Sequence, residues 1–153
     1  RRVARIALPA TIAAVLAIGG LRLLTPIEPI DGVAAPISAL SAVPPELRRK
    51  PVLNDYAFGG FLIFEHVRPF IDARVELYGD KMMSLYDKLR GGDHEAVESA
   101  LKRYDIAWTI FAPGDRIVAA LDREPGWRRL YADMTAVVHV RDAASGTQGL
   151  RGD

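Results

Sequence analysis

The sequence predicts an α/β fold with a small mixed sheet of about four or five strands, flanked by helices and preceded by one transmembrane helix. Three observations predict it: an apolar N-terminal run, strand-like segments separated by helical ones, and a pair of hairpin-like strands near the C-terminus. Strands separated by helices usually pair in parallel through right-handed crossovers, whereas a hairpin adds an antiparallel edge.

The N-terminal segment is almost unbroken apolar sequence from Ile6 to Leu24, and three arginines precede it. A helix of about 19 residues is about as long as the hydrocarbon core of a bilayer is thick. We therefore expect residues 1–24 to form a transmembrane helix with a cytoplasmic basic flank, which places the rest of the chain outside the cytoplasm. A cleaved signal peptide is the second interpretation and a buried soluble helix the third. The length of the run and the absence of an initial Met favour the membrane helix.

Charge is distributed unevenly along the chain. Of the 20 basic residues, four arginines fall within residues 1–24 beside no acidic residue, so the remainder carries 16 basic against 19 acidic residues. A mildly acidic domain without a basic stripe is a poor nucleic-acid binder, so no nucleic-acid partner is expected. The remaining length suffices for one core, and the absence of cysteine excludes disulfides and thiolate chemistry.

Residues 25–51 contain six prolines and are predicted to form a stiff tether that leaves the membrane. One short helix interrupts this tether in our interpretation. It begins at Pro36 and places Ile37, Leu40 and Val43 on one face.

The extracytoplasmic α/β domain is expected to span residues 52–141. Its first strand candidate is Val52–Asp55. The apolar run Tyr56–His66 fits a strand or a buried helix, and Asp55 as an N-cap favours the helix. The alternating pattern of Pro69–Val75 predicts a buried strand.

Two helices follow, capped by Asp80 and Asp93 and separated by Gly91-Gly92. Their inward faces are Met82, Leu85, Tyr86 and Leu89 on the first helix, and Val97, Ala100, Leu101 and Tyr104 on the second.

The C-terminal part of the domain is predicted to contain a strand, a helix and a hairpin. A strand over Ile106–Ala112 leads to a short helix capped by Asp115. Trp127–Ala132 and Thr135–Arg141 then form the two arms of the hairpin. Residues 142–153 are small and polar, which predicts a disordered tail.

No catalytic or metal site is predicted. His66, His94 and His139 are far apart in the sequence and lack the spacing of metal ligands. The serines lack the frame of a nucleophile elbow, and no cofactor is expected in this fragment.

Two segments carry the candidate ligand-binding residues, because charged groups at strand ends beside glycine-rich elements are where α/β folds build binding crevices. The candidates are Asn54, Asp55, Tyr56, Phe58, Gly59, Gly60, Asp72, Arg74 and Tyr78. A structural role is the alternative, and we favour it. Asp72 and Arg74 would share a strand face and pair with each other, while Asn54 and Asp55 would form a turn and a cap.

These segments, in this order after an apolar helix, resemble a known family. The matching residues are Asn54-Asp55-Tyr56, Gly59-Gly60-Phe61-Leu62-Ile63-Phe64, Pro69-Phe70-Ile71-Asp72-Ala73-Arg74 and Tyr78-Gly79-Asp80. They are similar to the extracytoplasmic C-terminal domain of a large bacterial family of polytopic membrane proteins. That family is related to the C-type glycosyltransferases that use polyprenyl-phosphate sugars, and many members are described as mannosyltransferase-like. Phe61, Phe64 and Ala73 depart from the family pattern.

The resemblance implies an accessory, non-catalytic domain with the last membrane helix of a multi-span protein of the bacterial inner membrane. The family's catalytic acid and lipid-phosphate site would lie upstream of this chain. The implied partners are the lipid bilayer, the upstream transmembrane domain of the same protein, and a glycan or polyprenyl-linked sugar. The alternative is a single-pass, membrane-anchored interaction module whose aromatic segment docks on a partner.

Overall fold

The computed structural model describes residues 2–24 and 30–142, which belong to two units with a boundary after Ile30. In the first unit, α1 (Arg2–Leu24) is helical throughout, as the apolar run predicts. Among the described residues, no helix has both the length and the hydropathy required to cross a membrane. The predicted tail lies outside the described residues from position 143 onwards, as does the first part of the predicted tether, residues 25–29.

The second unit is an α/β fold with a four-stranded mixed sheet flanked by helices, which confirms the α/β part of the predicted fold class. Its elements are α2 (Ile37–Ser41), α3 (Pro45–Arg48), β1 (Val52–Asn54), η1 (Tyr56–Phe58), α4 (Gly59–Phe64), η2 (Val75–Leu77), α5 (Gly79–Arg90), α6 (His94–Arg103), β2 (Trp108–Phe111), α7 (Arg116–Leu121), β3 (Trp127–Ala132) and β4 (Val137–Arg141). The sheet order is β1-β2-β4-β3, with β1 and β2 parallel and the other pairs antiparallel. The C-terminal hairpin forms as predicted.

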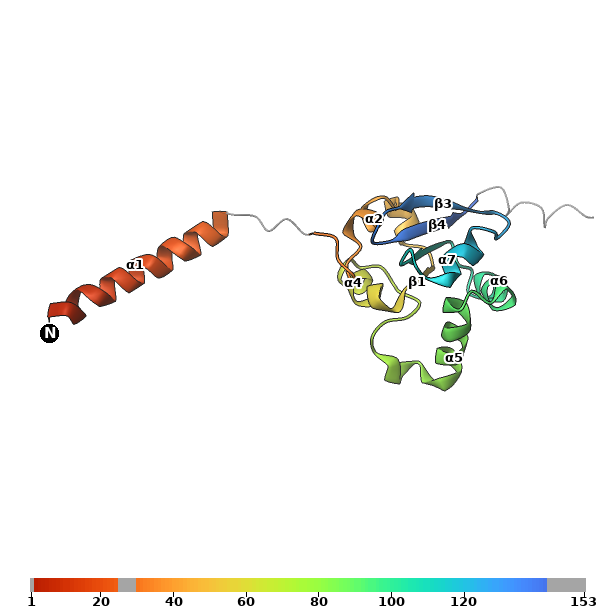
Figure 1. The fold of residues 1–153 in the computed structure, drawn as a ribbon, viewed down its shortest axis with the longest axis horizontal. Coiled ribbons are helices and arrows are strands. Elements are labelled where there is room, and N and C mark those ends of the chain that lie inside the picture. Colours follow the sequence, from red (N-terminus) through yellow and green to blue (C-terminus); the bar gives the residue numbers. More distant parts are fainter. Residues whose placement is uncertain (1, 25–29, 143–153) are drawn as a thin grey trace, which may run out of the picture. The chain divides into compact units, whose positions relative to one another are not determined.

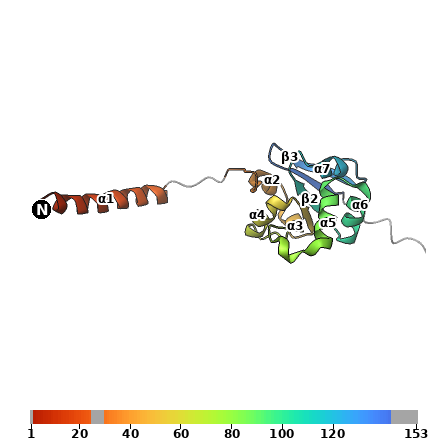
Figure 2. The same ribbon diagram turned by 60° about the horizontal axis from the view of Figure 1, so that its bottom comes forward.

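Both faces of the sheet are covered, so the unit has three layers (Figures 1 and 2). Successive residues of a strand point to opposite faces, and the two cores follow that alternation. Val52 and Trp108 pack with residues of α2 and α4, whereas Leu53 and Phe111 pack with residues of α5, α6 and α7. The near-continuous burial of β1, β2 and β4 follows from this double coverage.

The tether prediction for residues 25–51 is wrong from Asp31 onwards, because the compact unit already begins there. The short helix predicted there forms as α2, and Ala39, Leu40 and Val43 are buried in the core. The prolines of this segment delimit its helices without preventing them, since Pro36 and Pro44 precede α2 and α3 directly. Burying the apolar residues of this segment against the sheet is more favourable than leaving them exposed to water.

The buried strand predicted over Pro69–Val75 does not form, and the chain passes there as a loop that ends in η2. Its backbone groups bond to side chains instead of a neighbouring strand. The amide of Phe70 donates to Asn54 Oδ1 at 2.7 Å, and the amide of Arg74 donates to Asp72 Oδ1 at 2.9 Å. These local bonds satisfy the polar backbone without a sheet ladder.

Of the three aspartates predicted to cap α5, α6 and α7, only one makes the expected cap bond. Asp93 caps α6 by accepting from the Ala96 amide at 2.9 Å, as predicted. Asp80 lies one residue inside α5, whose N-cap is Tyr78, so the predicted Asp80 cap is wrong. Asp115 stands at the N-cap of α7 but makes no side-chain cap bond, because its carboxylate pairs with Arg90.

Candidate ligand-binding site

The two segments that carry the predicted site meet in the structure, and Asn54 joins them. Its side chain is fully buried at the end of β1. Asn54 Nδ2 donates to the carbonyl of Ile71 at 2.9 Å and to that of Asp55 at 2.7 Å, while Oδ1 accepts from the amides of Phe70 and Ile71 at 2.7 and 3.4 Å. Asn54 therefore holds the 70–71 loop in place and has no atom to offer a ligand.

The aromatic and glycine candidates divide between packing and exposure. Phe58 is buried in the core, and Gly59 lies so close to the 70–72 loop that a Cβ atom there would be 2.4 Å from the carbonyl oxygen of Ile71. Gly60 is exposed, and a Cβ atom added to it would meet no other atom within 4 Å in the described part of the chain. The Tyr56 hydroxyl donates to the Ala73 carbonyl at 3.3 Å. Only Gly60 and Tyr56 of these four therefore keep exposed surface.

Asp72, Arg74 and Tyr78 form a fixed polar group. Asp72 is 3 % exposed and takes a bidentate pair of bonds from the Arg74 guanidinium, at 2.9 Å from Nε and 2.7 Å from an Nη atom. The Tyr78 hydroxyl donates to Asp72 Oδ2 at 2.8 Å. The hydrogen bonds from Arg74 hold the pKa of Asp72 well below its usual range, and burial followed by the Asp72 carboxylate raises the pKa of Tyr78. The predicted pairing is thus present, although on a loop and not on a strand face.

This polar group lines an open pocket of about 430 Å³, whose other walls include Ile63, His66 and Arg68. A carboxylate, a guanidinium and a phenol therefore converge on one hollow of the surface. The Arg74 side chain is 59 % exposed, so the guanidinium can contact a ligand while it stays bonded to Asp72. We call this hollow the Asp72 pocket.

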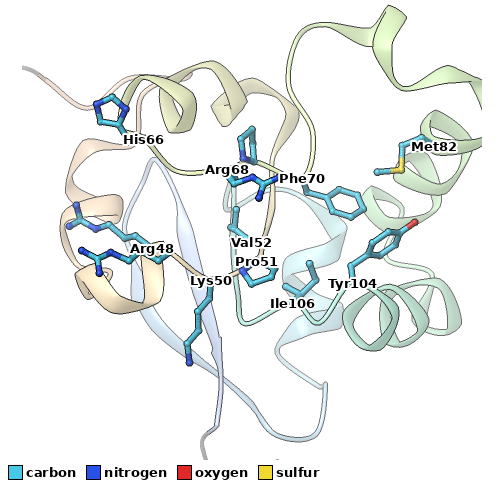
Figure 3. A pocket seen from close by; sticks show the side chains of 12 residues that line it. Arg48, Lys50, Pro51, Val52, His66, Arg68, Phe70, Met82, Tyr104 and Ile106 are labelled. Atoms are coloured by element: carbon cyan, nitrogen blue, oxygen red, sulfur yellow. The ribbon is translucent and has the colours of Figure 1, made fainter.

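A second pocket of about 620 Å³ adjoins it, since His66, Arg68 and Pro69 line both. Its cationic side consists of Arg48, Arg49, Lys50 and Arg68 with His66 beside them, and its apolar side includes Phe70, Met82, Tyr104 and Ile106. Figure 3 shows Arg48 and His66 towards one side of the view, Phe70, Met82 and Tyr104 towards the other, and Arg68 between them. We call it the cationic pocket.

Sequence reasoning missed the cationic pocket. The run Arg48-Arg49-Lys50 was visible, but it fell within the predicted tether. Only the fold brings this run beside Arg68 and the aromatic residues that line the same hollow.

A further buried polar cluster lies where β1 and β2 end. Asp55 caps η1 by accepting from the Ala57 amide at 2.8 Å, and the Tyr86 hydroxyl accepts from the Tyr56 amide at 2.6 Å. Asp115 takes a bond from Arg90 at 3.0 Å. Burial, followed by a hydrogen bond with Asp115, raises the pKa of Asp55, and burial followed by the charge of Asp55 raises the pKa of Tyr86.

We expect Asp55→Asn to raise the free energy of unfolding at pH 7 by about 1 kcal/mol, because Asn caps a helical turn as well as Asp and carries no charge to bury. A raised pKa in the folded state means that wild-type stability is fullest below the unfolded pKa, at about pH 4, and declines as the pH rises through the folded pKa. The variant should lack that decline. Urea unfolding between pH 4 and pH 8 measures it. Asp93→Asn, at the exposed cap of α6, is the matched control, and an equal change there would contradict the prediction.

His139 lies buried in β4 as an internal sheet residue. Its Nε2 is 3.0 Å from Asp122 Oδ1, and burial lowers its pKa. The Arg129 side chain, with a smaller contribution from His139, holds the pKa of Asp122 at about 2. Over residues 2–24 and 30–142, no three side chains of the metal-ligating types are grouped so that they could hold an ion.

Comparison of the chain with protein-family models, with curated proteins and with solved structures found no match in any of the three. The resemblance to glycosyltransferase-like membrane proteins therefore stays a prediction from the residues that carry it.

Proposed function

We propose that this chain is an accessory, non-catalytic domain of an integral membrane glycosyltransferase-like protein that depends on polyprenyl-phosphate sugars. In this proposal residues 1–24 cross the bacterial inner membrane, and the α/β unit lies outside the cytoplasm. Its task is to contact a sugar or acceptor glycan at the Asp72 pocket while another part of the protein performs the transfer.

The observation that carries the proposal is the polar group of the Asp72 pocket. Sugar hydroxyls both donate and accept hydrogen bonds, so the exposed guanidinium of Arg74 and the phenol of Tyr78, both fixed by the buried Asp72 carboxylate, suit them. Asp72 and Arg74 orient each other through a bidentate pair, so the ligand would not have to order these side chains on binding. Ile63 supplies an apolar surface for the carbon face of a sugar ring.

The assignment of α1 to a membrane is supported by its composition. The helix carries Ile12, Val15, Leu16, Ile18 and Leu21 among small residues, and it contains no acidic residue. Aliphatic side chains exposed along a helix are costly in water and favourable in lipid. Intrahelical bonds satisfy the backbone of such a helix in either surrounding.

A second candidate is the membrane-anchored interaction module, and one observation favours it. Phe64 is 77 % exposed at the end of α4, and Leu77 is 66 % exposed in η2. Exposed large apolar side chains of this kind can anchor a protein partner. In this alternative the Asp72 pocket has only a structural role.

The test uses the full chain in lipid nanodiscs and measures saturation transfer by NMR to methyl glycosides, with methyl α-mannoside as the first probe. We expect binding that Arg74→Gln weakens by about tenfold, because a charge-assisted hydrogen bond contributes roughly 1.5–3 kcal/mol. Arg141→Gln is the matched control, since Arg141 forms an ion pair with Asp105 away from the pocket.

Extraction of the chain from membranes by carbonate at high pH would contradict the membrane anchor proposed for residues 1–24. Absence of glycoside binding, together with crosslinking to a protein through position 64, would favour the interaction module.

A further inference from the structure

The cationic pocket gathers four permanent positive charges. Within the part of the chain that the structure describes, no ion pair involves the four side chains Arg48, Arg49, Lys50 and Arg68. The described lining of the pocket contains no acidic residue. Elsewhere in the same unit, Arg74 and Arg129 hold carboxylates in bidentate pairs. Cationic side chains that line one hollow without acidic neighbours give it a positive potential, which attracts an anion.

The fold holds this cationic side in place at Arg48 and at Lys50. The Arg48 guanidinium donates from Nε to the carbonyl of Val43 at 2.8 Å and from an Nη atom to that of Ser41 at 3.4 Å, while Trp108 Nε1 donates to the carbonyl of Lys50 at 3.3 Å. The amide of Ala107 donates to the carbonyl of Pro51 at 2.9 Å. The charged run is therefore tied to the edge of the sheet, which lowers the ordering cost of binding.

Arg68 is positioned by bonds on both sides of it. The amide of Val67 donates to the carbonyl of Leu62 at 2.8 Å and closes the end of α4, while the amide of Phe70 is held by Asn54. His66, between α4 and Arg68, adopts a φ of 60°, a backbone conformation that glycine adopts with less strain. An imidazole is thus kept at the pocket at some conformational cost.

The opposite side of the pocket is apolar and aromatic. Phe70 and Tyr104 pack edge to face with ring centroids 5.0 Å apart, and Met82 lies near them on α5. These three side chains are only partly buried, so they present apolar surface to the hollow. An anion alone would leave that surface in contact with water.

We propose that the cationic pocket is a binding site for an organic phosphate with an apolar substituent, the phosphate lying among the arginines and the substituent against Phe70, Met82 and Tyr104. A phosphate dianion offers oxygen acceptors to several guanidinium groups at once, and these bind it in a planar, bidentate geometry. A volume of about 620 Å³ suits a small organic molecule. This inference does not depend on the proposed function, because it uses neither the Asp72 group nor a membrane position for α1.

The test measures binding of three soluble probes to the full chain in nanodiscs by titration calorimetry. Phenyl phosphate carries both chemical features, inorganic phosphate carries only the anion, and benzyl alcohol carries only the ring. We expect phenyl phosphate to bind at least tenfold more tightly than either of the other two. Equal affinity for phenyl phosphate and inorganic phosphate would overturn the proposal.

Variants locate the two halves of the site. Arg68→Gln and Arg49→Gln should each weaken phenyl phosphate binding by about tenfold, while Arg123→Gln, an exposed arginine outside the pocket, should leave it unchanged. Met82→Gln should reduce the preference for phenyl phosphate over inorganic phosphate without changing affinity for the latter. Equal losses in the Arg68 and Arg123 variants would indicate surface charge alone and overturn the proposal.

His66→Gly separates binding from folding. Glycine relieves the positive φ, so we expect a higher midpoint of thermal unfolding together with weaker binding of phenyl phosphate. An unchanged affinity for phenyl phosphate in this variant would show that His66 does not contact the ligand, which contradicts its place in the site.

Two sources could supply such a phosphate, and a competition experiment distinguishes them. If water-soluble dihexanoyl phosphatidic acid displaces phenyl phosphate, the source is a lipid headgroup with its adjoining chain. If phenyl phosphate binds and the lipid does not displace it, the source is a soluble organic phosphate. Binding to anionic vesicles that Arg49→Gln and Arg123→Gln reduce equally, without binding of phenyl phosphate, would overturn the site and indicate contact with a charged membrane surface.

Discussion

Replacing Gly59 by alanine is expected to destabilise the α/β unit by about 3 kcal/mol or more. The added Cβ would lie 2.4 Å from the carbonyl oxygen of Ile71 and 2.6 Å from the Cα atom of Asp72. Both neighbours are backbone atoms of a loop that Asn54 holds, so the clash cannot be relieved by rotating a side chain. Overpacking of a site that cannot yield costs this order of free energy. Urea unfolding monitored by circular dichroism measures it.

Gly60→Ala is the matched control for this prediction. The two glycines are adjacent in α4, yet within the described residues nothing lies within 4 Å of a Cβ atom at Gly60. Alanine inside an exposed helix is favoured over glycine by roughly 0.5–1 kcal/mol, so this variant should be as stable as wild type or slightly more so. Equal destabilisation by both substitutions would mean that α4 does not pack on the 70–72 loop as described.

Asn54→Ala is expected to lower the free energy of unfolding by about 3 kcal/mol. The substitution removes both donors and the acceptor that hold the 70–71 loop, and leaves the amide of Phe70 and the carbonyl of Ile71 without these partners. Buried polar groups without partners cost about 1–3 kcal/mol each. We also expect faster proteolytic cleavage within residues 66–80, because Asn54 ties that loop to β1.

Thr109→Val provides the contrast on the neighbouring strand. Thr109 pairs with Leu53 across β1 and β2 and is fully buried, but its hydroxyl has no hydrogen bond within the part of the chain that the structure describes. Valine has nearly the same shape and no hydroxyl to desolvate, so stability should stay the same or rise. A loss as large as that of Asn54→Ala would show that burial of any polar side chain, and not the hydrogen bonds of Asn54, determines the effect.

The local patterns of the sequence predicted much of the fold. Asp93 caps α6 as expected, and Val97, Ala100 and Leu101 face the core at helical spacing. The C-terminal hairpin forms with its predicted strands, and the parallel pair of β1 and β2 follows from the helices between them. These features depend on residues close together in the chain, where capping and periodicity act.

The predictions failed where a distant residue decided the local structure. The alternation over residues 69–75 resembled a strand, but Asn54 supplies the partners that a sheet would otherwise have supplied. The proline content of residues 31–51 indicated a tether, but one face of the sheet provides a surface against which Leu40 and Val43 are buried. Tertiary packing outweighs local propensity in both cases.

The sequence by itself determined the fold class, the apolar helix at the N-terminus and the two segments in which the candidate residues lie. It also left the pairing of Asp72 with Arg74 as one of two interpretations. Only the tertiary structure decided which candidates have structural roles. Buried packing and hydrogen bonds occupy Asn54, Asp55, Phe58 and Gly59. An open pocket is lined by Asp72, Arg74 and Tyr78. The tertiary structure also decided that Arg48, Arg49 and Lys50 lie beside Arg68 and an aromatic surface. The physical reason is that a pocket is made by side chains from separate segments, and their meeting depends on how the whole core packs.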